Sequence, residues 1–217
     1  MPPAWLPLAA LSLIVVASAL RVWSVARAEG IKAFDFGRAR SIQVVAERNW
    51  KVSVCAALGL ALLAWLAPEW ERSLGRPEWS TAPSLRWISA LLFSASAAVI
   101  VVAQLQMGAS WRIGVPRDGP GALVSRGLFA WSRNPIFVGL VGAFAALFLW
   151  SPNIATAAVL AAVWTLTLVQ VRIEEEALRE THGDAYEAYA ARVGRWFGRR
   201  RIRVSLPPGA IQARPNT

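Results

Sequence analysis

Three polar clusters lie beside apolar stretches of this sequence, and each contains side chains that suit the binding of a small charged molecule. In the first, residues 107–114, the ring of Trp111 stands beside the fixed positive charge of Arg112. Such a pair could hold an anion or stabilise one that forms during a reaction. The simpler interpretation is an interfacial tryptophan next to an arginine that sets membrane topology.

The second cluster is Arg133, Asn134 and Pro135, directly before an apolar run. An arginine beside the N-terminus of a helix can bind an anionic group such as a carboxylate. An ordinary helix start explains the same residues, with Asn134 as the N-cap and Pro135 as the first helical residue. The sequence leaves both interpretations open.

The third cluster begins with three consecutive acids, Glu174, Glu175 and Glu176, where the last apolar run ends. Cytoplasmic ends of membrane helices favour basic residues, so three acids there need an explanation. They could form a carboxylate site for a cationic ligand or for hydroxyl groups. The simpler interpretation is solvated charge, with Glu175 and Arg179 forming a helical pair worth ~0.2–0.5 kcal/mol.

A short helix is expected after these acids. The pair His182-Gly183 should end the preceding helix, and Asp184 with Glu187 has the spacing of a capping box. His182 is the single histidine of the chain, and its place in a turn favours a solvated residue over an acid or base. Three side chains share one face of the new helix by their spacing: Tyr186, Tyr189 and Val193.

Apolar runs of membrane-spanning length must position these clusters, because crossing the hydrocarbon core takes about 20 mostly apolar residues. Hydrophobic residues make up 56% of the 217 and charged residues only 17%, which argues against a water-soluble protein. The predicted fold is an all-α polytopic membrane protein with about five spans. They are residues 4–20, 52–67, 85–107, 136–150 and 154–171.

Two connections between the spans carry further expectations. The linker of residues 151–153 is so short that it predicts an antiparallel helical hairpin. The span 136–150 is short, so it should take a turn from upstream or thin the bilayer.

Residues 38–50 have the spacing of an interfacial helix. Tryptophans near segment ends are expected to form an interfacial belt: Trp5, Trp23, Trp50, Trp65, Trp70, Trp87, Trp111 and Trp150.

Basic residues alternate between rich and poor connections, which predicts an external N-terminus and a cytoplasmic C-terminus. The protein is therefore expected to be a multi-pass protein of the inner (plasma) membrane, with its polar clusters facing the cytoplasm. The first segment has its arginines after the apolar run, so it is expected to be a span and not a cleaved signal. Residues 205–217 are expected to be a disordered end.

The charge balance of +10 could indicate nucleic acid or an anionic membrane face. Hydropathy favours the membrane, and the arginines of residues 195–203 are expected to contact anionic lipid headgroups at ~1 kcal/mol each. No nucleic-acid partner is expected. A single cysteine, Cys55, and a single histidine leave no cluster with metal-ligand spacing, so no metal is expected.

The order of three segments resembles a known family. MGASWRIGV, LVSRGLFAWSRNPIFVGL and EEEALRETHGDAYEAYAARVGRWF, arranged around a membrane hairpin, are similar to the isoprenylcysteine carboxyl methyltransferases and their bacterial relatives, which are allied to the phospholipid methyltransferases. The resemblance covers about residues 106–197. It implies an integral-membrane transferase that uses S-adenosylmethionine, releases S-adenosylhomocysteine, and holds the cofactor at the cytoplasmic end of the C-terminal helices.

The resemblance also implies roles for individual residues. The Arg-His-Pro element of the family corresponds to Arg133, Asn134 and Pro135, and its Glu-Glu-x-x-Leu element begins at Glu174 and Glu175. The following pattern corresponds to Tyr186, Tyr189 and Arg192. These are the expected cofactor-binding residues, with Arg112 and Arg133 as the expected catalytic residues. Asn134 stands where the eukaryotic enzymes have a histidine, so a titrating role is lost there, and Phe137 stands where tyrosine is frequent.

The expected activity is methyl transfer to a hydrophobic acceptor: an isoprenoid cysteine carboxylate, a lipid, or a small thiol or acid. Two alternatives remain, an NADPH-dependent membrane reductase resembling sterol reductases and a non-catalytic membrane scaffold. Membrane lipids and a hydrophobic or lipidated acceptor are the expected partners. The expected regions are residues 1–105 with the N-terminal spans, 106–197 with the cofactor site, and a basic tail at 198–217.

Overall fold

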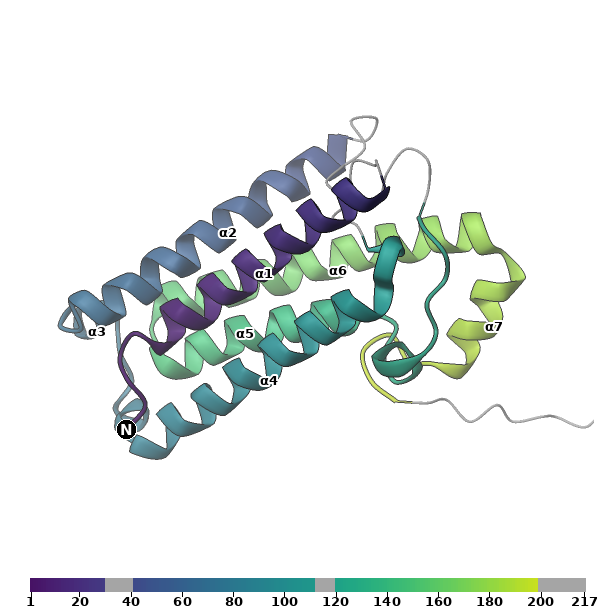
Figure 1. Ribbon diagram of the computed structural model, residues 1–217. Helices are drawn as coiled ribbons and strands as arrows, with labels where there is room; N and C mark the ends of the chain where they lie inside the picture. Colours follow the sequence, from purple (N-terminus) through teal and green to yellow (C-terminus); the bar gives the residue numbers. More distant parts are fainter. Residues whose placement is uncertain (30–40, 112–119, 199–217) are drawn as a thin grey trace, which may run out of the picture.

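The fold consists of helices that run side by side along one axis (Figure 1). The computed structural model describes residues 1–29, 41–111 and 120–198. Long helices form the bundle: α1 (Leu6–Glu29), α2 (Ser41–Leu66), α4 (Pro83–Met107), α5 (Pro135–Trp150) and α6 (Ile154–His182). Short helices connect or flank them: α3 (Trp70–Ser73), η1 (Glu78–Thr81), η2 (Gly108–Ser110), η3 (Gly127–Ala130) and α7 (Asp184–Arg192). The predicted all-α polytopic class is confirmed.

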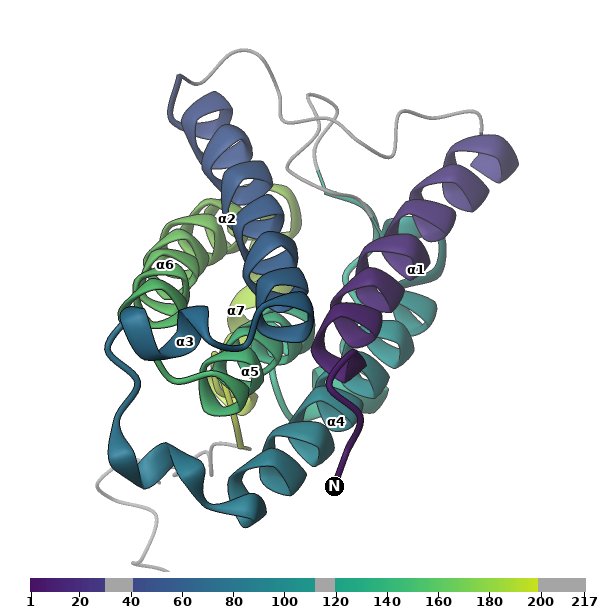
Figure 2. The same ribbon diagram turned by 90° about the vertical axis from the view of Figure 1, so that its left-hand side faces the viewer.

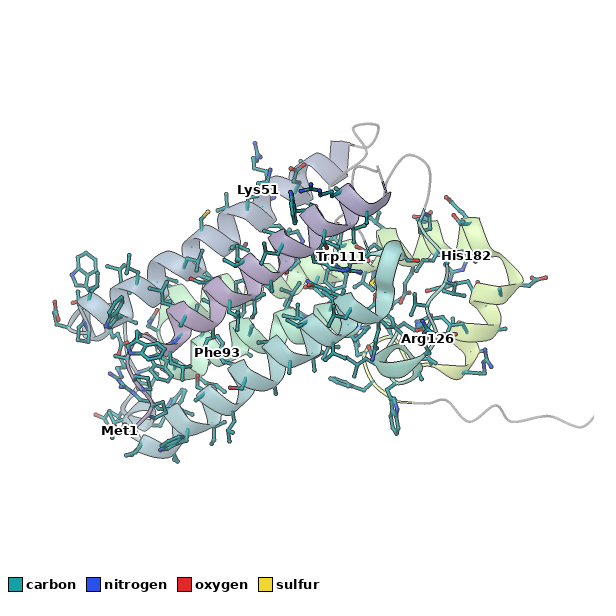
Figure 3. All side chains as sticks on the ribbon, in the orientation of Figure 1. Met1, Lys51, Phe93, Trp111, Arg126 and His182 are labelled. Carbon is teal, nitrogen blue, oxygen red and sulfur yellow. The ribbon has the colours of Figure 1, made fainter. Side chains whose placement is uncertain are left out.

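Four of the long helices, α1, α2, α4 and α6, are long and apolar enough to cross a membrane. The fifth, α5, has 16 residues, about 24 Å at 1.5 Å per residue, which is less than the ~30 Å hydrocarbon core. It begins only one residue before the expected position, so the extra upstream turn is absent. Met1 and His182 lie at opposite ends of the bundle (Figure 3). The orientation of the two ends across a membrane remains a prediction.

Three helices extend well beyond their apolar runs. The first continues to Glu29 and the last to His182, so the acids at 174–176 belong to α6 itself. The second begins at Ser41, so residues 41–50 are the first turns of α2. Residues 41–50 are helical as expected, but they continue into α2 and form no separate interfacial helix, while residues 38–40 lie outside the described residues. Polar residues continue these helices because an established helix adds further turns at little cost.

The core joins the N-terminal helices to the C-terminal ones. Buried apolar side chains from α1, α2, α4, α5 and α6 form one cluster that includes Leu11, Ala61, Phe93, Phe144 and Val163. Seen from the α3 end, α1 lies against α4 and α2 lies against α6 (Figure 2). The helices therefore enclose one interior to which both halves of the chain contribute.

The closest packing is between α4 and α5, where glycines of α5 face α4. A Cβ at Gly139 would stand 2.6 Å from Cγ1 of Ile100, and one at Gly142 would stand 2.5 Å from Oγ of Ser96. Ser89 Oγ also donates a 2.7 Å hydrogen bond to the carbonyl of Ala146. Small residues at a membrane helix interface permit this close approach of the two backbones.

The predicted hairpin of α5 and α6 is confirmed, and a complete capping box starts its second helix. Asn153 Oδ1 accepts hydrogen bonds from the backbone N–H groups of Ala155 and Thr156, at 3.0 Å each. The Thr156 hydroxyl accepts the Asn153 N–H in return, at 3.2 Å. The expected capping box at Asp184 is wrong, because Gly183 is the N-cap of α7 and no side chain caps that helix.

Candidate functional site

Arg133, Asn134 and Pro135 lie where the chain turns into α5. Asn134 is the N-cap and Pro135 the first helical residue, as predicted, but the Asn134 side chain caps nothing. Its backbone N–H donates to Oγ of Ser132 at 3.1 Å. Its side-chain amide donates to Glu175 Oε1 at 3.2 Å. Asn134 therefore starts the helix with its backbone and ties α5 to α6 with its side chain.

Glu175 is the centre of a buried charge cluster and is only 4% exposed. Arg195 donates to it through Nη2 at 2.7 Å and through Nε at 3.1 and 3.2 Å to its two oxygens. Arg133 Nη2 lies 3.3 Å from Glu175 Oε1. The expected pair of Glu175 with Arg179 is wrong, since Arg179 turns outward and pairs with Glu187 of α7. Helical spacing made that pair possible, but Arg133 and Arg195 occupy the carboxylate instead.

Glu174 has different surroundings from those of Glu175, although the two are consecutive. Its carboxylate accepts a 3.0 Å hydrogen bond from Nε2 of Gln170, one turn earlier on α6. Glu174 and Gln170 line a cavity between the helices together with Arg133 and Asn134. Glu174 therefore faces the cavity, and Glu175 stands behind the residues that do.

This cavity has a volume of about 630 Å³, which is in the range of small-molecule sites. One part of its wall is the polar group just described, with Pro135, Trp111 and Tyr189 nearby along the lining. The other walls are mostly apolar and come from α1, α2, α4 and α5, with Glu47 and Lys51 of α2 among their few polar residues. Examples are Leu11, Ile14, Val54, Leu58, Ile100 and Phe144. Trp50 of α2 and Phe137 of α5 also line it, with ring centroids 6.4 Å apart. The cavity thus combines charged groups with a long apolar wall.

The face that the tyrosine spacing predicted on α7 is confirmed, because Tyr186, Tyr189 and Val193 are all buried. Tyr189 Oη donates a 2.7 Å hydrogen bond to the carbonyl of Phe129. The Tyr186 hydroxyl accepts a 3.5 Å hydrogen bond from Nη1 of Arg133. Burial raises the pKa of both phenols above the usual value, with a smaller contribution from Glu175. These tyrosines thus hold the segment that leads into α5, with Phe129 and Arg133, against α7.

Arg192 is not brought to this group. It is exposed, and its Nε donates to the carbonyl of Ala188 on its own helix, at 3.1 Å. Arg112 lies outside the described residues. The cofactor role of Arg192 and the catalytic role of Arg112 therefore stay predictions.

Two simpler interpretations of single residues are wrong. Trp111 is 3% exposed and lines the cavity, so it is not part of an interfacial belt, and Trp150 is buried as well. His182 is half-buried, and its Nε2 lies 3.0 Å from the carbonyl of Gly121, which requires the ring proton on Nε2. Trp111, Arg126 and His182 lie at the α7 end of the bundle (Figure 3). His182 thus fastens the chain segment that brings Gly121 to the cavity wall.

Two residues of the site were missed from the sequence. Gln170 lies one turn before Glu174, so its position on the same helical face was a signal that could have identified it. Arg195 was assigned to lipid headgroups because it begins a basic run. It instead reaches Glu175, and only the fold brings the two together.

The geometry defines a class: an all-α membrane protein with a cavity that has charged side chains from the segment before α5 and from α6 at one wall and mostly apolar side chains along the others. Residues 84–185 match the family model described as Phospholipid methyltransferase. The predicted resemblance is thereby confirmed: this region of the chain, from the start of α4 to the start of α7, is similar to a family of membrane methyltransferases. The match includes Arg133, Asn134, Glu174 and Glu175 but ends just before Tyr186. No curated protein matches the chain.

Proposed function

We propose that this protein transfers a methyl group from S-adenosylmethionine to a hydrophobic acceptor inside the membrane. The observation that carries the proposal is one cavity that joins Arg133, Gln170 and Glu174 to an apolar wall built from α1, α2, α4 and α5. The family match supports the methyltransferase activity. The charged group would hold the cofactor, and the apolar walls would hold the acceptor.

The residues present fit the amino-acid end of S-adenosylmethionine. Arg133 Nε and Gln170 Oε1 are buried and have no hydrogen-bond partner among the described residues. One is a donor and the other an acceptor, and unpaired buried groups of this kind are costly. A carboxylate could accept from Arg133, while an ammonium or hydroxyl group could donate to Gln170 or Glu174. Both orphan atoms belong to residues that line the cavity.

When bound, S-adenosylmethionine supplies an electrophilic methyl group on a sulfonium. The protein contributes orientation and exclusion of water. Arg133 and Glu174 bind opposite charges and so fix the direction of a zwitterion in the cavity. The apolar side chains that line the cavity would keep water away from the acceptor. A carboxylate acceptor needs no general base, whereas a thiol or amine must first lose a proton.

We further propose that the methyl acceptor is a hydrophobic molecule of the bilayer. The candidates are an isoprenoid cysteine carboxylate, a lipid, or a small thiol or acid, entering laterally between spans. The apolar wall includes side chains of α1 and α2, which lie outside the family match, so these helices would select the acceptor. Reaction at the cytoplasmic face of the plasma membrane, and lipids as partners, are parts of the same proposal.

Calorimetric titration of detergent-purified protein with S-adenosylhomocysteine, beside NADPH, tests the cofactor. We expect S-adenosylhomocysteine to bind with micromolar affinity and NADPH not to bind. Arg133→Gln should abolish most of that affinity, while Arg126→Gln, a change at an exposed arginine of the same loop, should leave it unaltered. NADPH binding alone would favour a reductase. Folded, monodisperse protein that binds neither ligand would favour a scaffold.

A further inference from the structure

The segment that follows α7 returns to the start of α5 and is tied to it by its backbone. The carbonyl of Gly194 accepts a 3.0 Å hydrogen bond from the N–H of Arg133. The carbonyl of Arg195 accepts from the Asn134 side chain at 3.3 Å and from the Ser132 hydroxyl at 3.4 Å. A Cβ at Gly194 would stand 2.4 Å from the carbonyl oxygen of Phe197, so the turn leaves no room for a side chain there.

The side chain of Arg195 is placed by the same segment, and it meets Glu175 and not the cavity. Its guanidinium makes three contacts with the Glu175 carboxylate, the shortest at 2.7 Å. These hydrogen bonds raise the pKa of Arg195, so the group stays charged. The next residue, Trp196, packs against Trp164 of α6, with the two ring centroids 5.4 Å apart. Arg195 is therefore held by backbone and ring contacts on both sides of its position.

Two guanidiniums share one carboxylate in this cluster. Arg133 and Arg195 contribute two positive charges and Glu175 one negative charge, which leaves a net positive charge among the three. Of the three, only Arg133 lines the cavity. Without Arg195, the Arg133–Glu175 pair would be neutral, and Arg133 would be the one cation of the described residues within ion-pair distance of Glu175. Arg133 would then turn further toward Glu175, since a buried carboxylate is stable only when paired.

We infer that Arg195 is a positioning residue that occupies Glu175 and thereby leaves Arg133 available to a carboxylate in the cavity. This rests on the proposed function and assigns the C-terminal segment 193–198, beyond the family match, to the cofactor site. Arg195 touches no ligand in this arrangement. It acts through Glu175, and its effect is confined to the ligand group that Arg133 binds.

The test compares two ligands: S-adenosylhomocysteine and its decarboxylated analogue, which keeps the adenosine, the sulfur and the amino group. Arg195→Gln should weaken S-adenosylhomocysteine binding about ten-fold and the analogue less than two-fold, because only the first has the carboxylate that Arg133 would hold. A merely structural role would weaken both ligands equally. Arg126→Gln is the matched control, and both affinities should be those of the wild type.

A second variant separates charge from packing. In Glu175→Gln combined with Arg195→Gln, Arg133 no longer faces a competing carboxylate, so the preference for S-adenosylhomocysteine over the analogue should return. Arg195→Lys keeps the charge and should retain most of the preference, which preserves the test where Arg195→Gln does not fold. Equal weakening of both ligands by Arg195→Gln, or loss of the preference in Arg195→Lys or the double variant, overturns the inference.

The failure of the proposed function has a different signature. Wild-type protein that is folded but binds neither S-adenosylhomocysteine nor the analogue refutes the cofactor and this inference together. Wild-type protein that binds S-adenosylhomocysteine, with an Arg195→Gln variant that binds it equally well, refutes the inference alone.

Discussion

Replacing Glu175 by Gln removes the negative charge that Arg133 and Arg195 share, while the same change at Glu174 removes a charge that faces the cavity. The two substitutions are equal in size and adjacent in sequence. The structure gives them different consequences, because Glu175 is 4% exposed and holds two arginines. We expect Glu175→Gln to act mainly on folding and Glu174→Gln mainly on ligand binding.

The magnitude for Glu175→Gln follows from its contacts. Breaking a fully buried ion pair costs about 3–5 kcal/mol. Here the Arg195 side chain is 38% exposed, so solvent screens part of that pair, and glutamine keeps one oxygen as an acceptor. Its new NH₂ group, however, would face the donors of Asn134 or the arginines. We therefore expect the free energy of unfolding to fall by about 1–3 kcal/mol.

The expectation for Glu174→Gln has the opposite pattern. The hydrogen bond from Gln170 needs only an oxygen acceptor, which glutamine retains, so stability should change by less than about 0.5 kcal/mol. Loss of the charge should weaken S-adenosylhomocysteine binding by at least ~1 kcal/mol, about five-fold, where a charge-assisted bond to the ligand is lost.

Denaturation in mixed micelles, followed by far-ultraviolet circular dichroism, measures the first quantity, and calorimetric titration measures the second. Glu180→Gln, a change at an exposed acid of α6, is the control and should leave both unchanged. The reasoning is refuted when Glu174→Gln destabilises the fold more than Glu175→Gln does. Unchanged ligand affinity in both variants would reduce the acids to a structural role.

Three further predictions concern other parts of the structure. Tyr186 and Tyr189, the only two tyrosines of the chain, have raised pKa values because they are buried, so phenolate absorbance should appear in folded protein only above their usual pKa of about 10. The two buried phenols make their full contribution to the free energy of unfolding below about pH 10. This contribution is lost as pH rises toward the folded-state pKa values, because the phenols of the unfolded chain ionise first. Titration of the phenols near pH 10 in folded protein would contradict this prediction. Gly139→Ala should destabilise the protein by about 1–3 kcal/mol, because its Cβ would stand 2.6 Å from Ile100, whereas Gly59→Ala, with nothing within 4 Å, should be neutral or stabilising by up to ~1 kcal/mol. Equal denaturation midpoints for the two variants would show that the α4–α5 contact is looser than described. Cys55 is exposed and lines the cavity, so an acceptor bound there should slow the alkylation of Cys55 by a membrane-permeant maleimide. S-adenosylhomocysteine should not slow it. An acceptor that the protein methylates but that does not slow this alkylation would show that acceptors bind away from α2.

The positions of the spans were largely predictable, because a bilayer selects helices by the length and hydropathy of a single continuous segment. The α5–α6 hairpin and the break at Gly183 were predictable for a similar local reason. Helix ends were less so: α1 and α6 continue into charged sequence, because polar side chains find partners such as the Gly108 carbonyl, which accepts a 2.7 Å hydrogen bond from Arg21. Hydropathy contains no record of such partners.

The candidate site was only partly predictable. Arg133, Asn134, Glu174 and Glu175 were singled out by residue type and motif order, and all four lie together in the fold. Their separate tasks were not distinguishable, since Glu174 and Glu175 are equivalent in sequence and differ only in which direction α6 turns them. Arg195 was misassigned, because a basic residue near a membrane segment gives the same pattern whether it meets lipid headgroups or a buried carboxylate.

The amino-acid sequence, read alone, was enough for the fold class, the membrane setting and the methyltransferase resemblance, because these depend on local hydropathy and on the order of short motifs. The pairing of Glu175 with Arg133 and Arg195 joins residues 20 or more positions apart on three segments of the chain. The cavity likewise needs walls from α1 and α2 beside α4 and α5. Which charged groups face one another is set by the packing of distant segments, where burial makes each unpaired charge costly, and no local pattern contains that information.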